Sequence, residues 1–130
     1  MMTNYDIIRA HYAGSDNRDL DAMLAPITAE TAWTEMAGFP CAGTYHGPEE
    51  IVENVFKALG EAWENYTLKV ERILDAGDTV IGVGTYSGTF KETGKHMEAR
   101  VTHVWDLKDG KVIRFEQFTD TLLVAEAMKS

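Results

Sequence analysis

Residues 97–119 have the sequence MEARVTHVWDLKDGKVIRFEQFT, and this stretch decides the fold. Two runs, 97–107 and 112–119, alternate between apolar and polar side chains on either side of Lys108-Asp109-Gly110. Alternation with a period of two predicts β-strands, and Asp-Gly between two such runs indicates a hairpin. We therefore expect two neighbouring antiparallel strands here.

The segments before and after this hairpin indicate an α+β domain. A helix that begins at Gly47-Pro48 carries an apolar stripe that ends at Trp63, and Asn4 can cap the first helix. Residues 79–90 are rich in glycine, which predicts a bend in that strand. Helices followed by a run of strands are typical of an antiparallel sheet. We expect helices at 5–14, 19–24, 47–63 and 121–128, a loop at 37–46, and further strands at 31–36, 67–74 and 79–90.

The composition is that of one globular domain over residues 1–130. Hydrophobic residues make up 45% and charged residues 25% of the chain, as in ordinary globular proteins. The net charge of −9 argues against nucleic-acid binding, which needs a basic surface. No run approaches the ~18 apolar residues of a membrane span, and residues 1–9 lack a secretion signal pattern. We expect a cytoplasmic protein.

Few residues of this chain suit a metal site. The single cysteine, Cys41, excludes an internal disulfide and a site made of several thiolates. The four histidines show no spacing typical of metal ligands. We expect neither a metal nor a cofactor.

Strand alternation sorts the side chains of the hairpin between two faces. In the first strand, the more apolar face carries Val101, His103, Trp105 and Leu107, so we assign this face to the interior. In the second strand, the expected inner face carries Ile113, Phe115, Gln117 and Thr119. The outer face keeps Val104, Val112 and Phe118 beside charged residues. Because apolar side chains on a second face are usually covered, we expect a homodimer through this outer face.

Polar side chains that point inward are the candidates for function. Burying such a group without a partner costs roughly 1–3 kcal/mol. His103, Gln117, Glu35 and Tyr12 come from separate segments that would all line the inside of a curved sheet. The expected walls of a pocket between the sheet and the helices are Trp33, Phe39, Phe56, Leu59, Trp63, Trp105 and Phe115. We expect a small hydrophobic organic molecule in that pocket.

Four motifs give the chain a resemblance to a known family. They are Asp19-Leu20-Asp21, Trp33-Thr34-Glu35, Tyr45-His46-Gly47-Pro48-Glu49-Glu50-Ile51 and the segment from Asp109-Gly110 to Thr119-Asp120. In this order they resemble the SnoaL-like proteins of the nuclear transport factor 2-like superfamily, which also includes ketosteroid isomerases and polyketide cyclases. The resemblance implies a cone-shaped curved antiparallel sheet packed against N-terminal helices, a cystatin-like roll.

The resemblance also implies roles for individual residues. The proton-shuttling acid of ketosteroid isomerases matches Glu35, and their oxyanion-binding tyrosine falls at His11, next to Tyr12. Their second oxyanion donor matches His103. The acid/base aspartate of the cyclases matches Gln117, and a glutamine cannot take up a proton near neutral pH. Asp120, at the end of the strand, is either a catalytic acid or the cap of the last helix.

The sequence leaves three functions open. The first is a cofactor-free isomerase or cyclase, in which Glu35 moves a proton on a hydrophobic carbonyl compound and His103, with Gln117 or Tyr12, stabilises the enolate. The second is a module that binds a small apolar ligand without changing it, as the glutamine at 117 suggests. The third is a dimeric interaction domain with no working pocket.

Overall fold

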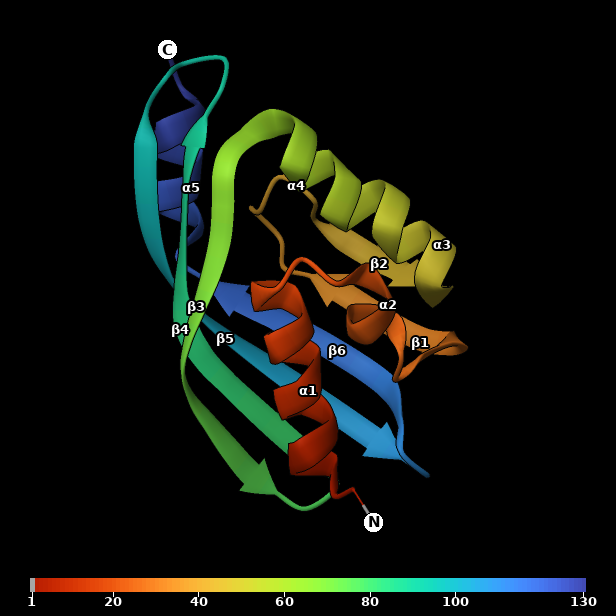
Figure 1. Ribbon diagram of the computed structural model, residues 1–130. Coiled ribbons are helices and arrows are strands. Elements are labelled where there is room, and N and C mark those ends of the chain that lie inside the picture. Colours follow the sequence, from red (N-terminus) through yellow and green to blue (C-terminus); the bar gives the residue numbers. More distant parts are fainter. Residues whose placement is uncertain (1) are drawn as a thin grey trace.

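The computed structural model describes residues 2–130, so Met1 of the expected domain lies outside the described residues. One strongly curved sheet has the strand order β2-β1-β6-β5-β4-β3. Helix α1 contacts β3 and β4, α3 contacts β1, and α5 contacts β5 and β4, so helices cover the concave side of the sheet (Figure 1). The elements are α1 (Asn4–Asp16), α2 (Leu20–Leu24), β1 (Ile27–Glu35), β2 (Gly43–His46), α3 (Gly47–Ile51), the π-helical turn η1 (Val52–Phe56), α4 (Lys57–Ala62), β3 (Trp63–Ala76), β4 (Thr79–Phe90), β5 (His96–Lys108), β6 (Lys111–Thr119) and α5 (Thr121–Met128).

The expected α+β roll is confirmed, with one difference in strand direction. Strand β1 pairs with β6 in parallel, whereas the other pairs are antiparallel, so the sheet is mixed. Hairpin turns force neighbouring strands to run antiparallel. Because β1 and β6 are separated by most of the chain, no turn fixes their relative direction, and the sequence pattern could not predict it.

Three local predictions are wrong. Residues 37–46 are not all loop, because β2 pairs with β1 there. Trp63 is the first residue of β3 rather than the end of a helix. Its ring is buried and packs against the ring of Phe90. The cap of α1 is Thr3, not Asn4. Thr3 Oγ1 accepts from the Asp6 N–H at 3.1 Å, and the Asp6 carboxylate accepts from the Thr3 N–H at 3.1 Å, which forms a capping box.

The β5–β6 hairpin forms as expected from its Asp-Gly pair. Asp109 and Gly110 have φ values of 52° and 75°, and Lys108 pairs with Lys111 across the turn. A two-residue hairpin turn whose twist matches that of its two strands requires a positive φ at both central residues. The expected inner residues of β5, namely Val101, His103, Trp105 and Leu107, are all buried.

A β-bulge just after the turn changes which side chains of β6 face inward. Leu107 pairs with Val112 but Asp106 pairs with Arg114, so Ile113 has no residue opposite it. As a result Val112 is 1% exposed and Ile113 is 46% exposed. The assignment of Ile113 to the inner face and of Val112 to the outer face is therefore wrong. From Phe115 onward the expected alternation holds.

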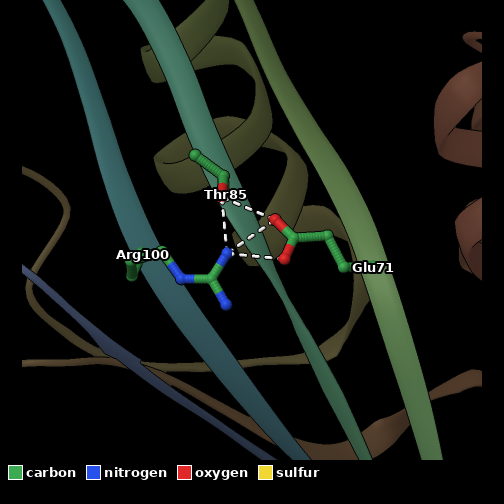
Figure 2. A network of polar contacts seen from close by, with 3 residues as sticks. All are labelled: Glu71, Thr85 and Arg100. Atoms are coloured by element: carbon green, nitrogen blue, oxygen red, sulfur yellow. Dashed lines mark hydrogen bonds and ion pairs between the residues drawn. The ribbon is translucent and has the colours of Figure 1, made fainter.

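The convex face of the sheet carries charged side chains beside apolar ones. Arg100 Nη1 donates to Glu71 Oε1 at 2.7 Å and to Thr85 Oγ1 at 2.9 Å, and Thr85 Oγ1 donates to Glu71 Oε2 at 2.8 Å. Figure 2 shows these three residues lying across β3, β4 and β5. The bond from Arg100 lowers the pKa of the Glu71 carboxyl. Phe118, on β6 of the same sheet, is 45% exposed.

Among residues 2–130, no helix has both the length and the apolar character needed to cross a membrane.

Candidate functional site

A cavity of about 400 Å³ lies between the concave face of the sheet and the helices. Small-molecule sites usually have volumes of roughly 300–1,000 Å³. Exposed lining residues at its mouth include Arg18, between α1 and α2, and Gly60 of α4. Val55 and Phe56 belong to η1 and also line the cavity. Single π-helical turns of this kind are frequent at functional sites.

A chain of hydrogen bonds runs through the floor of the cavity. Trp105 Nε1–H donates to Tyr12 Oη at 2.8 Å, and Tyr12 Oη lies 2.9 Å from His103 Nδ1. On the other side of the imidazole, His103 Nε2 lies 2.7 Å from Tyr86 Oη. Both ring nitrogens of His103 are therefore bonded to tyrosine hydroxyls, and the imidazole holds those two hydroxyls in place.

Gln117 joins this chain to Glu35. The Met36 N–H can only donate, and it points at Gln117 Oε1 at 3.3 Å, which fixes the orientation of the amide. Gln117 Nε2 then donates to Tyr86 Oη at 2.8 Å and to Glu35 Oε1 at 3.4 Å. Both polar atoms of Gln117 are thus satisfied, and the residue is 1% exposed.

Glu35 is a buried carboxyl at the cavity wall. It is 3% exposed and lines the cavity from the last position of β1. Burial raises the pKa of Glu35 from its ordinary 4.5 to about 8, because the charged carboxylate is poorly solvated there. Near neutral pH the carboxyl is mostly protonated, and it loses its proton within the range in which enzymes use general acids and bases.

Both histidines of the cavity are neutral. Burial lowers the pKa of His103 to about 3 and the pKa of His11 to about 4. His11 Nδ1 lies 2.8 Å from the Met23 carbonyl oxygen, which can only accept, so this nitrogen carries the ring proton. His11 Nε2 is then unprotonated.

The structure brings four of the five expected polar residues together. Glu35, His103, Gln117 and Tyr12 are all buried and belong to one hydrogen-bonded chain. Asp120 lies apart from them. It is exposed, it does not line the cavity, and its carboxylate accepts from the Leu123 N–H at 3.2 Å. Asp120 is therefore the cap of α5, the second of its two expected roles.

Only some of the residues expected to form the wall of the pocket line the cavity. Trp33, Phe56, Leu59 and Phe115 line the cavity, and the rings of Trp33 and Phe115 stack with centroids 3.8 Å apart. The remaining expected wall residues, Phe39, Trp63 and Trp105, are buried but are not among the lining residues. Trp105 lies below the wall and contacts both Trp33 and Phe115 edge-on.

Several lining residues were not predicted from the sequence, and Tyr86 and Tyr66 are two of them. His11 also lines the cavity, whereas the sequence offered it only as the position that matches the oxyanion-binding tyrosine. The alternation of β4 places Tyr86 on the same face as Val80, so strand parity could have identified it. His11 follows Ile8 by three positions and precedes Tyr12, a spacing that puts all three on one helix face. Tyr66 lies at a register shift of β3 and had no comparable signal.

The site offers no metal-binding cluster. No group of three or more His, Cys, Asp or Glu side chains in the described part of the chain could hold a metal ion.

Comparisons with known proteins agree with this architecture. An NTF2-like protein from Burkholderia thailandensis E264 is 60% identical over 100% of both chains, with a TM-score of 0.99. TerC, co-crystallised with polyporic acid, is 27% identical over 98% of both chains, with a TM-score of 0.86. A protein with a ketosteroid isomerase-like fold from Catenulispora acidiphila DSM 44928 is 18% identical over 96% of this chain and 94% of its own, with a TM-score of 0.77, and shows the fold alone.

A comparison with curated proteins finds no match. The SnoaL-like domain family matches residues 8–115, which include every residue that lines the cavity. This chain therefore belongs to the SnoaL-like domain family and has an NTF2-like fold.

Proposed function

We propose that this protein is a cofactor-free enzyme that moves a proton on a hydrophobic carbonyl compound, as an isomerase or cyclase. The observation that carries the proposal is the Glu35 carboxyl, buried at the wall of a cavity that is lined in part by aromatic rings. With a pKa of about 8, this group can hold or release a proton near neutral pH. Removal of a proton next to a carbonyl needs such a base close to the substrate.

The tyrosine hydroxyls supply the second part of the mechanism. When Glu35 takes a proton from the carbon next to a carbonyl, negative charge develops on the carbonyl oxygen. Tyr12 and Tyr86 both line the cavity, and their hydroxyls are held in position by His103. A donor fixed in place beforehand stabilises such a charge without reorganisation. In this proposal His103 and Gln117 are positioning residues, and Glu35 is the catalytic acid/base.

A binding module is the second candidate, and one comparison favours it. TerC is co-crystallised with polyporic acid, and by analogy the cavity of this chain would hold a small organic ligand. Without proton transfer, the same pocket would bind the ligand and release it chemically unchanged.

Proton exchange separates the two candidates. The protein is incubated in D2O with a panel of aryl ketones and cyclic enones, and deuterium uptake next to the carbonyl is followed by proton NMR. We expect uptake with the native chain and a loss of at least roughly 100-fold with Glu35→Gln, because general acid–base catalysis contributes about 10²–10⁴-fold. Glu30→Gln is the matched control, since Glu30 is an exposed carboxyl of the same strand. Ligands that bind but exchange at the uncatalysed rate would assign the chain to the binding class.

The proposal also includes a second copy of the chain on the convex face. Phe118 is exposed there, and Val104 is half-buried on the neighbouring strand. Charges of both signs flank them, with Arg114 paired to Asp106 and Glu116. A face that carries both signs can complement itself across a two-fold axis, as homodimer interfaces require.

A further inference from the structure

Helix α2 is held in place mainly by α1. Within residues 2–130, α1 is the one helix or strand against which α2 packs extensively (Figure 1). None of the five residues of α2 is buried, although Leu20, Met23 and Leu24 have large apolar side chains. A short segment with so few buried contacts can detach at a much lower free-energy cost than global unfolding requires.

Helix α2 also forms part of the wall of the cavity. Leu20 and Met23 line the cavity, and so does Arg18 just before the helix. Leu20 is 43% exposed, and Met23 is half-buried. Gly60 of α4 and Thr67 of β3 are exposed lining residues that do not depend on α2. A movement of α2 away from α1 would therefore remove one side of the wall and leave the other sides in place.

Three contacts fasten α2 and its cap, Asp19, to α1. His11 Nδ1–H donates to the Met23 carbonyl oxygen at 2.8 Å, and the Asp19 N–H donates to the Gly14 carbonyl oxygen at 2.8 Å. Gly14 lets the two helices approach closely, because a Cβ at this position would lie 2.8 Å from Ala22 Cβ. Since His11 lines the cavity, a ligand in the cavity can contact one of the residues that fasten α2.

The two ends of this segment are fixed to different degrees. At its C-terminal end, Leu24 packs against the core, and the carbonyl oxygen of the buried Pro26 accepts from the Val112 N–H at 2.9 Å. At its N-terminal end, Arg18 is exposed and has a φ of 55°, a left-handed conformation that is unfavourable for its side chain. Residues in such conformations cluster in segments that switch between two arrangements. Arg18 can relax when α2 leaves α1.

We propose that residues 19–23 form a lid over the cavity, which opens about hinges at Arg18 and Leu24 and closes when His11 bonds to the Met23 carbonyl. Opening breaks the contacts with α1 and withdraws Leu20 and Met23 from the cavity wall. A ligand in the cavity contacts the closed lid, and a ligand that binds one state preferentially shifts the equilibrium toward that state. The lid would serve an enzyme and a binding module equally, so the inference does not depend on proton transfer by Glu35.

Hydrogen exchange of the native chain measures lid opening without a ligand. Exchange of the Asp19, Ala22 and Met23 amides is followed by NMR in D2O and compared with exchange of the Ile8 and Tyr12 amides in α1. We expect the lid amides to be at least roughly 100-fold less protected, because a helix as short as α2 does not persist once it leaves α1. Equal protection of the amides in α2 and α1 would overturn the inference.

Gly14→Ala should shift the lid toward its open state. The added methyl group collides with Ala22 Cβ, whereas alanine suits α1 itself better than glycine does. We expect the lid amides to exchange roughly tenfold faster while the α1 amides keep their protection. The matched control is the double variant Gly14→Ala/Ala22→Gly, which removes the colliding Cβ and should exchange like Ala22→Gly alone. Native exchange rates in Gly14→Ala, or an equal increase in α1, would contradict the proposed fastening.

A cysteine inside the cavity tests whether the lid controls access. Val55 is 2% exposed and lines the cavity from η1, so Val55→Cys places a thiol there, in a chain that also carries Cys41→Ala to remove its own buried thiol. We expect Gly14→Ala to raise the rate of reaction with the bulky aromatic reagent dithiobis(nitrobenzoate) by roughly tenfold. The rate with the small reagent methyl methanethiosulfonate should change little.

The aromatic reagent decides the outcome of this labelling experiment. A rate that does not rise in Gly14→Ala, or that rises no more than the rate of the small reagent, would show that α2 does not control access to the cavity. Because neither a ligand nor proton transfer is involved, the result is independent of the deuterium-uptake experiment with Glu35→Gln.

Discussion

The hydroxyl of Tyr12 occupies the space into which a side chain at position 82 would project. A Cβ added to Gly82 would lie only 2.8 Å from Tyr12 Cζ and would overlap the hydroxyl. Gly82 pairs with His103 across β4 and β5, so the missing side chain opens a path for Tyr12 to reach the imidazole. The glycine of one strand thereby allows a helix residue to join the hydrogen-bonded chain of the site.

We predict that Gly82→Ala separates Tyr12 from His103. The added methyl group overpacks the interior, which typically costs about 1–3 kcal/mol of stability. Thermal and urea unfolding measure this loss. Gly60→Ala is the control, since a Cβ at Gly60 meets nothing within 4 Å. A Gly82→Ala protein as stable as Gly60→Ala would show that the close approach of Tyr12 is not required.

Tyr86→Phe should destabilise the protein without changing its shape. The change leaves Gln117 Nε2 and His103 Nε2 each without one buried partner, and an unpaired buried group costs roughly 1–3 kcal/mol. Urea unfolding of Tyr86→Phe is compared with that of Tyr5→Phe, whose hydroxyl makes no hydrogen bond among the described residues. Equal unfolding midpoints for the two variants would contradict the assigned bonds.

Glu35 should make the stability depend on pH in a defined direction. Its pKa is about 8 in the folded protein and near 4.5 when it is exposed. Between these values the folded state keeps a proton that the unfolded state has lost, so stability falls as the pH rises. Relative to Glu35→Gln, the native chain should lose up to about 1.4 kcal/mol per pH unit in this window. Parallel curves of unfolding free energy against pH for the two proteins would exclude a raised pKa.

Phe118→Asp should weaken self-association through the convex face. An aspartate buried at an apolar contact lacks a partner and opposes dimer formation. Light scattering coupled to size-exclusion chromatography should give the mass of a dimer for the native chain and of a monomer for the variant. Leu122→Asp, at an exposed leucine of α5, is the control. A monomeric native chain, or a dimer in both variants, would rule out this interface.

Much of the site was predictable from strand alternation. A period of two placed His103 and Trp105 on the inner face of β5 and placed Gln117 on the inner face of β6, and all three are buried. Trp33 and Glu35, which were both expected to point inward, lie two positions apart on β1, and both are buried. Local patterns suffice here because a regular strand fixes the direction of each side chain.

The remaining features of the site depend on contacts that sequence patterns do not predict. The bulge at Ile113 reverses the expected faces of Val112 and Ile113, and no turn residue marks it. The glycines of residues 79–90 were expected to bend the strand, but the role of Gly82 depends on α1, which lies far away in the sequence. His103 was expected to contact the ligand directly, whereas its nitrogens are used by two hydroxyls that only the folded chain brings there.

The protonation of Glu35 tests the central claim most directly. Carbon-13 NMR of the chain labelled at the glutamate carboxyl carbons, with Glu35→Gln to assign the signal, gives the titration midpoint of this one group. A midpoint near pH 8 agrees with a buried acid/base at the cavity wall. A midpoint near 4.5, the ordinary value for this side chain, would contradict the mechanism.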